Sequence, residues 1–111
     1  MPKDDYYVIA YKLLKYLYDC LKASKEPNME IFDAAYFSID EPYWAYIIRN
    51  LYEDEYINGI ILIPMIGHSK DMVKVTTDIE ITPKGIQYLS ENSIFQKVKK
   101  QVKGISEILP I

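Results

Sequence analysis

The stretch from Asp40 to Gly85 constrains the fold of this chain most, because its hydrophobic period changes twice. It begins with apolar residues spaced three and four apart, which is typical of a helix with one face on a core. It continues with residues 73–81, where apolar and polar side chains alternate as in a half-buried strand. It ends with Thr82 and Pro83, a capping residue and a favoured first residue of a helix. We therefore expect a helix, a two-stranded hairpin and another helix.

The first helix of this stretch has two distinct faces. Asp40 can cap it, and Pro42 falls in the first turn, where a missing amide donor costs nothing. Its apolar stripe is predicted to face the core and consists of Trp44, Ile47, Ile48 and Leu51. The opposite face, which would meet a partner, presents Tyr43, Tyr46, Arg49, Asn50 and Glu53.

The hairpin is predicted from an apolar strand over residues 60–66 and the alternating strand over residues 73–81. Pro64 cannot donate to a ladder, so it indicates an edge or irregular position in the first strand. Residues 67–71 have the length and composition of a hairpin tip. Lys70 and Lys74 would then project from this hairpin.

Two further helices are expected before Asp40. Asp4 or Asp5 can cap a long helix to about Ala23, and Asn28 can cap a shorter one through Tyr36. Helix, short turn, helix and hairpin together indicate an α+β fold, a winged helix-turn-helix. It would have three N-terminal helices, a two-stranded wing and two C-terminal helices. Residues 1–92 form this domain, and residues 93–111 form a last helix in the same globular unit.

Composition excludes several classes of protein. With 111 residues, half of them apolar and eleven of them tyrosines, the chain fits one ordered domain. Absence of a long apolar run or signal-peptide pattern indicates a cytoplasmic protein with no membrane contact. Cys20 is expected to be a buried filler, and His68 lacks the further ligands of a metal site. With no phosphate loop or activated nucleophile, we expect no enzyme, no cofactor and no small-molecule substrate.

Two stretches carry a resemblance to a known family. They read Ile39-Asp40-Glu41, Asn50-Leu51 and Glu55-Tyr56-Ile57-Asn58-Gly59 in the first, and Ile81-Thr82-Pro83-Lys84-Gly85 and Tyr88-Leu89-Ser90-Glu91-Asn92 in the second. These segments resemble the YjcQ family of small bacterial and prophage-encoded winged-helix proteins. The resemblance implies a fold and a phage-related setting, and the family has no established biochemical role.

Two functions from different classes remain open. A DNA-binding transcriptional regulator or phage-related accessory protein would read double-stranded DNA with Arg49 and Asn50, which suit guanine and adenine edges. Tyr43 and Tyr46 would lie on the same face, with Lys70 and Lys74 on phosphates. The alternative is a protein-interaction module that keeps the winged-helix fold without binding DNA. It is favoured by charge, since five acidic residues and one basic residue lie between Asp40 and Glu55.

A homodimer is expected from the excess apolar surface of the first and last helices. The first helix has a second apolar face, and the last has a narrow apolar seam with no later element to cover it. The predicted interface consists of Tyr7, Tyr11, Leu14, Tyr18 and Leu21 with Phe95, Val98, Val102, Ile105 and Leu109. Folding of the last helix back onto the first, within a monomer, is the alternative.

Overall fold

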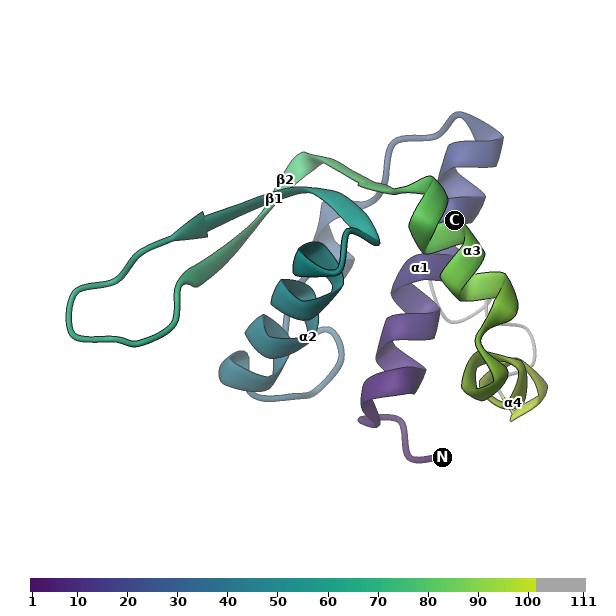
Figure 1. Cartoon of the computed structure of the whole chain (residues 1–111), viewed down its shortest axis with the longest axis horizontal. Coiled ribbons are helices and arrows are strands. Elements are labelled where there is room, and N and C mark those ends of the chain that lie inside the picture. The colour runs from purple at the N-terminus through teal and green to yellow at the C-terminus, as the bar shows by residue number, and fades with distance from the viewer. Residues whose placement is uncertain (102–111) are drawn as a thin grey trace.

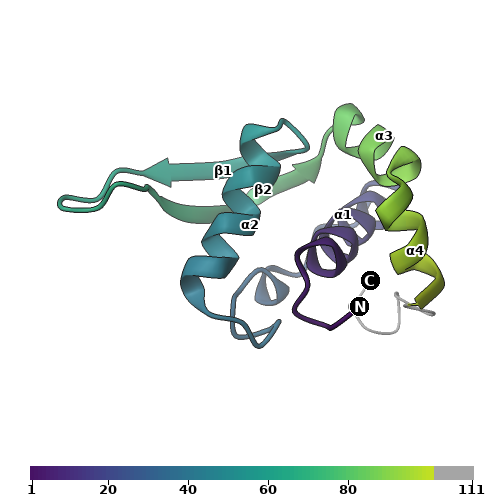
Figure 2. The same cartoon turned by 60° about the horizontal axis from the view of Figure 1, so that its bottom comes forward.

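A computed structural model describes residues 1–101, which form a mixed α+β fold. Its elements, in chain order, are α1 (Tyr6–Ala23), the 3-10 turn η1 (Met29–Ile31), α2 (Glu41–Glu53), β1 (Ile57–Ile63), β2 (Met72–Ile81), α3 (Pro83–Glu91) and α4 (Ser93–Gln101). Figures 1 and 2 both place α1 between α2 on one side and α3 with α4 on the other. The hairpin of β1 and β2 projects away from the helices. The predicted order of helix, hairpin and helix over residues 40–85 is confirmed.

The long helix α1 is the centre of the core. Asp5 caps it by accepting a hydrogen bond from the amide of Tyr7 at 3.0 Å. A helix that is apolar around most of its circumference must be covered on several sides. Elements α2, β2, α3 and α4 all pack against it. Its buried residues are Val8, Ile9, Ala10, Tyr11, Lys12, Leu13, Leu14, Tyr16, Leu17 and Cys20.

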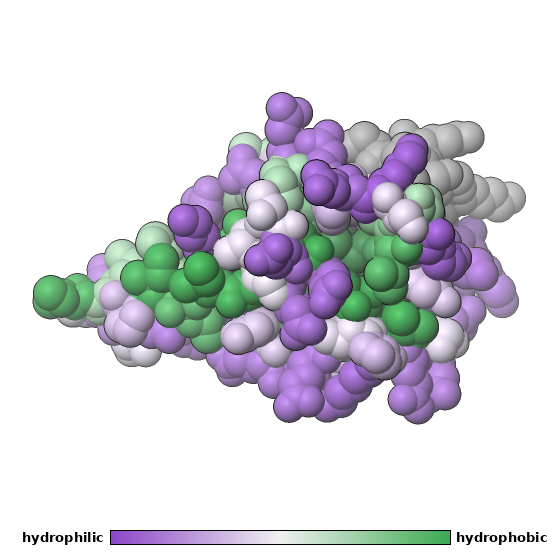
Figure 3. All heavy atoms as spheres, turned by 90° about the horizontal axis from the view of Figure 1, so that it is seen from above, coloured by the Kyte–Doolittle hydropathy of each residue, from purple (hydrophilic) through white to green (hydrophobic). Residues whose placement is uncertain are grey.

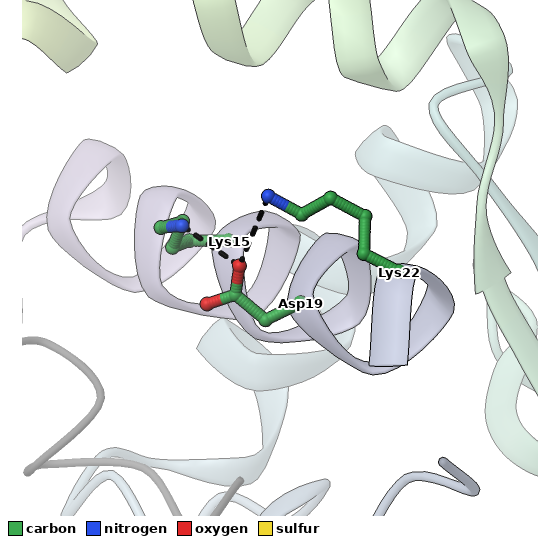
Figure 4. A network of polar contacts seen from close by, with 3 residues as sticks. All are labelled: Lys15, Asp19 and Lys22. Atoms are coloured by element: carbon green, nitrogen blue, oxygen red, sulfur yellow. Dashed lines mark hydrogen bonds and ion pairs between the residues drawn. The ribbon is translucent and has the colours of Figure 1, made fainter. Parts of the chain in front are cut away.

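The remaining stripe of α1 carries a small ion-pair network (Figure 4). One carboxylate oxygen of Asp19 lies 2.7 Å from Nζ of Lys15 and 3.7 Å from Nζ of Lys22. These pairs are spaced as neighbours on a helix face, and pairs of this kind contribute only a few tenths of a kcal/mol, about 0.3–0.5. The network therefore marks the solvated side of α1.

The last described helix packs onto the first within one chain. Phe95 and Val98 of α4 are fully buried, and the ring centroid of Phe95 lies 5.8 Å from that of Tyr11. Tyr11 and Leu14 are buried in the same way. The expectation that these four residues need a second chain to cover them is therefore wrong, because α4 covers α1 intramolecularly.

Little of the predicted dimer surface remains open. Tyr7 and Tyr18 are half-buried, and Leu21 is 49% exposed. The rest of the predicted seam, which is Val102, Ile105 and Leu109, lies outside the described residues. The homodimer stays a prediction, and its physical argument is now much weaker.

The predicted second helix is replaced by tight turns. Asn28 does act as a cap, because its side chain accepts from the amide of Glu30 at 3.0 Å. Only one 3-10 turn follows, and then the amides of Tyr36 and Phe37 donate to carbonyls three residues back. So short a helix is marginal alone, and tertiary packing decides its conformation. The prediction of three N-terminal α-helices is wrong at this segment.

The helix α2 follows its prediction closely. Trp44, Ile47, Ile48 and Leu51 are all buried, and the indole of Trp44 stacks on Phe37 with ring centroids 5.7 Å apart. Asp40 occupies the cap position but makes no side-chain hydrogen bond there. The spacing of the apolar residues in α2 was therefore enough to predict which of its residues face the core.

The hairpin begins earlier than predicted and contains a large bulge. Strand β1 starts at Ile57 rather than Ile60 and ends before Pro64, which has no amide to donate. At the base of the hairpin, the last regular pair is Asn58 with Glu80. Regular pairing resumes further out, at Ile60 with Val75. Four residues of β2 therefore stand opposite Gly59.

Gly59 is required at this bulge for two reasons. Its φ of 85° lies in the region that disfavours side chains, and a Cβ there would overlap the backbone of Asp78 and Ile79. The hydroxyl of Thr76 donates to the Gly59 carbonyl at 2.8 Å. The bulge therefore fixes where the outer half of the hairpin leaves the body.

A second close approach joins the hairpin to α3. The Thr82 amide donates to the carbonyl of Tyr56 at 3.0 Å, and its side chain caps α3 by accepting from Gly85 at 2.9 Å. A Cβ on Gly85 would overlap the same Tyr56 carbonyl. The predicted cap at Thr82 is confirmed, and the glycine is explained by close packing of helix against strand.

Two glycines with the same unusual backbone give a matched test of the bulge. Gly67 at the hairpin tip has a φ of 80°, but a Cβ there would meet nothing within 4 Å. We expect Gly67→Ala to cost about 1–2 kcal/mol through backbone strain alone. Gly59→Ala should cost about 1–3 kcal/mol more, because it adds a steric overlap. Urea denaturation measures both, and equal losses would contradict the crowding argument.

Candidate functional site

The six residues predicted to contact DNA lie on three separate surfaces. Tyr43, Tyr46 and Asn50 share one stripe of α2, at positions three and four residues apart. Arg49 is partly exposed on the neighbouring stripe. The last two, Lys70 and Lys74, are exposed on the hairpin.

The stripe on α2 forms one wall of a cleft, which we call the tyrosine cleft. Its volume is about 410 Å³, within the range of ligand pockets. The start of α1 and one residue of α3 supply the other walls. Its lining residues are Tyr6, Tyr7, Tyr43, Tyr46, Asn50, Asp54 and Tyr88.

Hydrogen bonds and ring contacts hold the walls of this cleft in place. The Tyr43 hydroxyl donates to the Asp4 carbonyl at 2.6 Å, which ties α2 to the residues before α1. Tyr6 meets Tyr7 with centroids 5.2 Å apart at 82°, and it meets Tyr46 at 6.1 Å and 73°. Edge-to-face pairs of this kind favour a fixed geometry. The cleft therefore has ordered aromatic walls.

The ring of Tyr88, which forms the third wall of the cleft, packs against Tyr56 and Phe95. It stacks on Tyr56 with centroids 4.0 Å apart and planes 7° apart, and it meets the edge of Phe95 at 4.8 Å. Because Tyr56 directly precedes β1, the foot of the hairpin touches the wall of the cleft.

Burial, with smaller effects from neighbouring groups, makes the hydroxyls of Tyr6 and Tyr88 hard to ionise. Desolvation, followed by nearby Tyr56, Tyr7 and Asp54, raises the pKa of Tyr88 to about 12. Desolvation also raises the pKa of Tyr6, with smaller effects from Tyr88 and Asp54 among others. Tyr6 and Tyr88 are therefore neutral at ordinary pH.

The hairpin carries the other unusual surface, visible as green along its length to the tip in Figure 3. Side chains of Leu62 and Val73 turn toward the core, whereas the opposite face of the same strands meets solvent. We call this opposite face and the tip the apolar hairpin face. Its apolar residues are Ile61, Ile63, Met65, Ile66 and Met72, of which only Ile63 is half-buried; exposed Lys74, which pairs with Ile61, lies on the same face.

A larger cavity of about 670 Å³ lies beside the turn at residues 36–38, lined in part by Lys3, Asp4 and Lys12. Lys12 is buried, and desolvation, with a smaller effect from Lys3, lowers the pKa of its ammonium group. The mixed charge of its lining, from two lysines and Asp4, gives this cavity no single preferred ligand.

Sequence reasoning missed three residues of the tyrosine cleft. The sequence patterns give Tyr6 and Tyr88 no role, and they count Asp54 only among the five acidic residues between Asp40 and Glu55. An available signal was the spacing of Asn50 and Asp54, which places both on one helix face with Tyr43 and Tyr46. The cleft residues that α1 and α3 supply could not be predicted from the local sequence, because their position depends on tertiary packing.

The described residues contain no group of three or more histidine, cysteine or acidic side chains that could hold a metal ion. Over the same range, no helix is long and apolar enough to cross a membrane. Cys20 is buried in α1, as predicted for a small filler.

Comparison with known proteins identifies the family. The family model described as YjcQ protein matches residues 11–108. The chain belongs to the YjcQ family. No curated protein and no solved structure matches it. In this YjcQ-family chain, the match begins inside α1 and spans the hairpin, α2 and α3.

The raised pKa of Tyr88 makes stability depend on pH in the alkaline range. The folded protein keeps the phenol protonated to about pH 12, whereas an unfolded tyrosine loses its proton near pH 10. The unfolded state then binds fewer protons, so the free energy of unfolding falls as pH rises from about 10 to 12. Urea denaturation of the parent and Tyr88→Phe at several pH values should show a shallower fall in the variant. Identical profiles would argue against this assignment.

Proposed function

We propose that this chain is a winged-helix protein with a binding role, and that its partner is a protein. In this interpretation α2 corresponds to the recognition helix and the hairpin to the wing. The order of α2, hairpin and α3 supports the winged-helix assignment. The proposed role is that of an interaction module rather than an enzyme.

The apolar hairpin face is the observation that carries the proposal. Ile66 at the tip is fully exposed, and Ile61 and Met72 are 48% and 46% exposed. Contiguous apolar surface at the end of a projecting element is typical of a protein-binding site, because water-exposed patches of this kind are otherwise avoided. A wing that grips phosphate would present mainly basic and polar groups, whereas this hairpin presents five apolar residues beside Lys70 and Lys74.

Charge and geometry on α2 support the same conclusion. Exposed Glu41 lies at the start of the helix, and Glu53 and Asp54 lie at its end, against Arg49 alone. Negative charge at both ends opposes approach to a phosphate backbone. Asn50 also donates one of its two amide hydrogens to the Tyr46 carbonyl at 2.8 Å, which holds its side chain against its own helix.

DNA binding is the second candidate, favoured by the partial exposure of Arg49 on α2 beside a hairpin with Lys70 and Lys74. A regulator or phage-related accessory protein acting in the cytoplasm would use these three side chains. The arrangement then resembles a reading helix with a phosphate-binding wing.

Photo-crosslinking at the hairpin tip tests the protein-binding proposal. We expect p-benzoylphenylalanine in place of Ile66 to give an adduct in expressing cells that protease removes and nuclease leaves intact. The same probe at Glu30, which is exposed on η1, is the matched control and should give no discrete adduct. An Ile66 adduct sensitive to nuclease would overturn the proposal.

Chromatography on immobilised duplex DNA tests the second candidate. A protein that neutralises phosphates is retained at low salt and released as salt rises. We expect this chain to flow through at about 50 mM salt, and we expect Arg49→Ala to behave identically. Salt-dependent retention that weakens in Arg49→Ala, but not in Lys25→Ala, would favour DNA binding instead.

A further inference from the structure

We propose that the tyrosine cleft binds a guanidinium group, supplied by an arginine side chain of the protein partner. This inference rests on the proposed protein-binding function and names the chemistry that the partner presents at a second point, apart from the apolar hairpin face. It turns three residues first considered for DNA reading, Tyr43, Tyr46 and Asn50, into parts of a cation site.

The aromatic walls suit a flat cation. Tyr6 stands nearly perpendicular to both Tyr7 and Tyr46, at 82° and 73°, so the cleft offers ring faces as well as ring edges. A cation above a tyrosine face is attracted by the ring quadrupole. The chain already makes this contact elsewhere, since Nζ of Lys22 lies 4.3 Å from the ring centroid of Tyr18.

The polar end of the cleft supplies two hydrogen-bond acceptors, from Asp54 and Asn50. Asp54 and Asn50 lie four residues apart at the end of α2, so they share one face. Within residues 1–101 the salt bridges involve Asp19, and none involves Asp54. The amide nitrogen of Asn50 is bound to the Tyr46 carbonyl, which leaves its Oδ1 to accept from a ligand. A carboxylate and an amide oxygen together match the several donors of a guanidinium.

The charge of Asp54 acts on the cleft itself. It contributes to raising the pKa of both Tyr6 and Tyr88, so the carboxylate lies within electrostatic reach of both rings. An arriving cation would offset this negative charge.

Arginine fits better than lysine or a small ammonium ion for geometric reasons. Its guanidinium is planar, stacks on aromatic rings, and sheds water more readily than a compact ammonium. Tyr46 is 47% exposed and Asp54 is exposed, so the cleft is open at this end to a side chain projecting from another protein. Its volume of about 410 Å³ leaves room for the aliphatic stem as well.

Titration with N-acetyl-arginine amide, followed by NMR of the Asn50 side-chain amide and the Tyr46 ring, tests the proposal on the full chain. The neutral isostere N-acetyl-citrulline amide and the N-acetyl-lysine amide are titrated in parallel at constant ionic strength. We expect the arginine compound to bind at least about tenfold more tightly than citrulline, which lacks the charge. It should also bind more tightly than the lysine compound.

Paired variants locate the site. Asp54→Asn keeps the shape and removes the charge, and it should weaken arginine binding about tenfold. Glu53→Gln, its exposed neighbour on the same helix end, is the matched control and should change binding little. Tyr46→Leu should weaken binding, whereas Tyr46→Phe, which keeps the aromatic face, should restore most of it. Near-UV circular dichroism confirms that each variant is folded.

The outcomes separate this inference from the proposed function. Equal binding of the arginine and citrulline compounds, or no binding of either, would overturn the guanidinium site. Equal binding of the lysine compound would also overturn it, because the cleft would then respond to charge alone. A protein adduct at Ile66 together with a failed titration would remove the cleft proposal and leave the protein-binding proposal standing.

Discussion

The burial of α1 on nearly every side is the constraint on which the rest of the structure depends. Ten of its residues are buried, and no single neighbouring element could cover them. Helix α2 packs from one side, α3 and α4 from the other, and the inner part of β2 along the helix. A central helix of this kind fixes the relative positions of elements that hardly touch each other. The tyrosine cleft is one result, because α2 and α3 reach it only by packing on α1.

The sequence predicted those features that depend on local pattern. The caps at Asp5, Asn28 and Thr82 were all readable, because a capping side chain and its amide lie within three residues. The core face of α2 followed from its period. Membership of the YjcQ family was also visible in short motifs and is confirmed. All of these signals are local, because the residues that determine each feature lie close together in the sequence.

Features set by distant contacts were not predictable in the same way. Periodicity showed that Tyr11 is on an apolar face, but it could not show that Phe95 would cover it. Likewise, Tyr46 was correctly placed on the face of α2 away from Trp44, but its neighbour Tyr6 comes from α1. The bulge opposite Gly59, where four residues of β2 have no regular partner, was not predicted either. Each miss reflects packing between elements rather than an error in local preference.

The hairpin consists of two strands, and each of them is an edge strand. Within the described part of the chain, β1 pairs with β2 alone, so every second backbone amide and carbonyl along its outer edge lacks a ladder partner. Unpaired edges beside exposed isoleucine and methionine are templates for strand addition and aggregation. Pro64 at the end of β1 and Lys74 within β2 are the kinds of residue that limit such pairing. The hairpin surface that we propose for recognition thus makes solubility depend on protein concentration, and a bound partner would cover it.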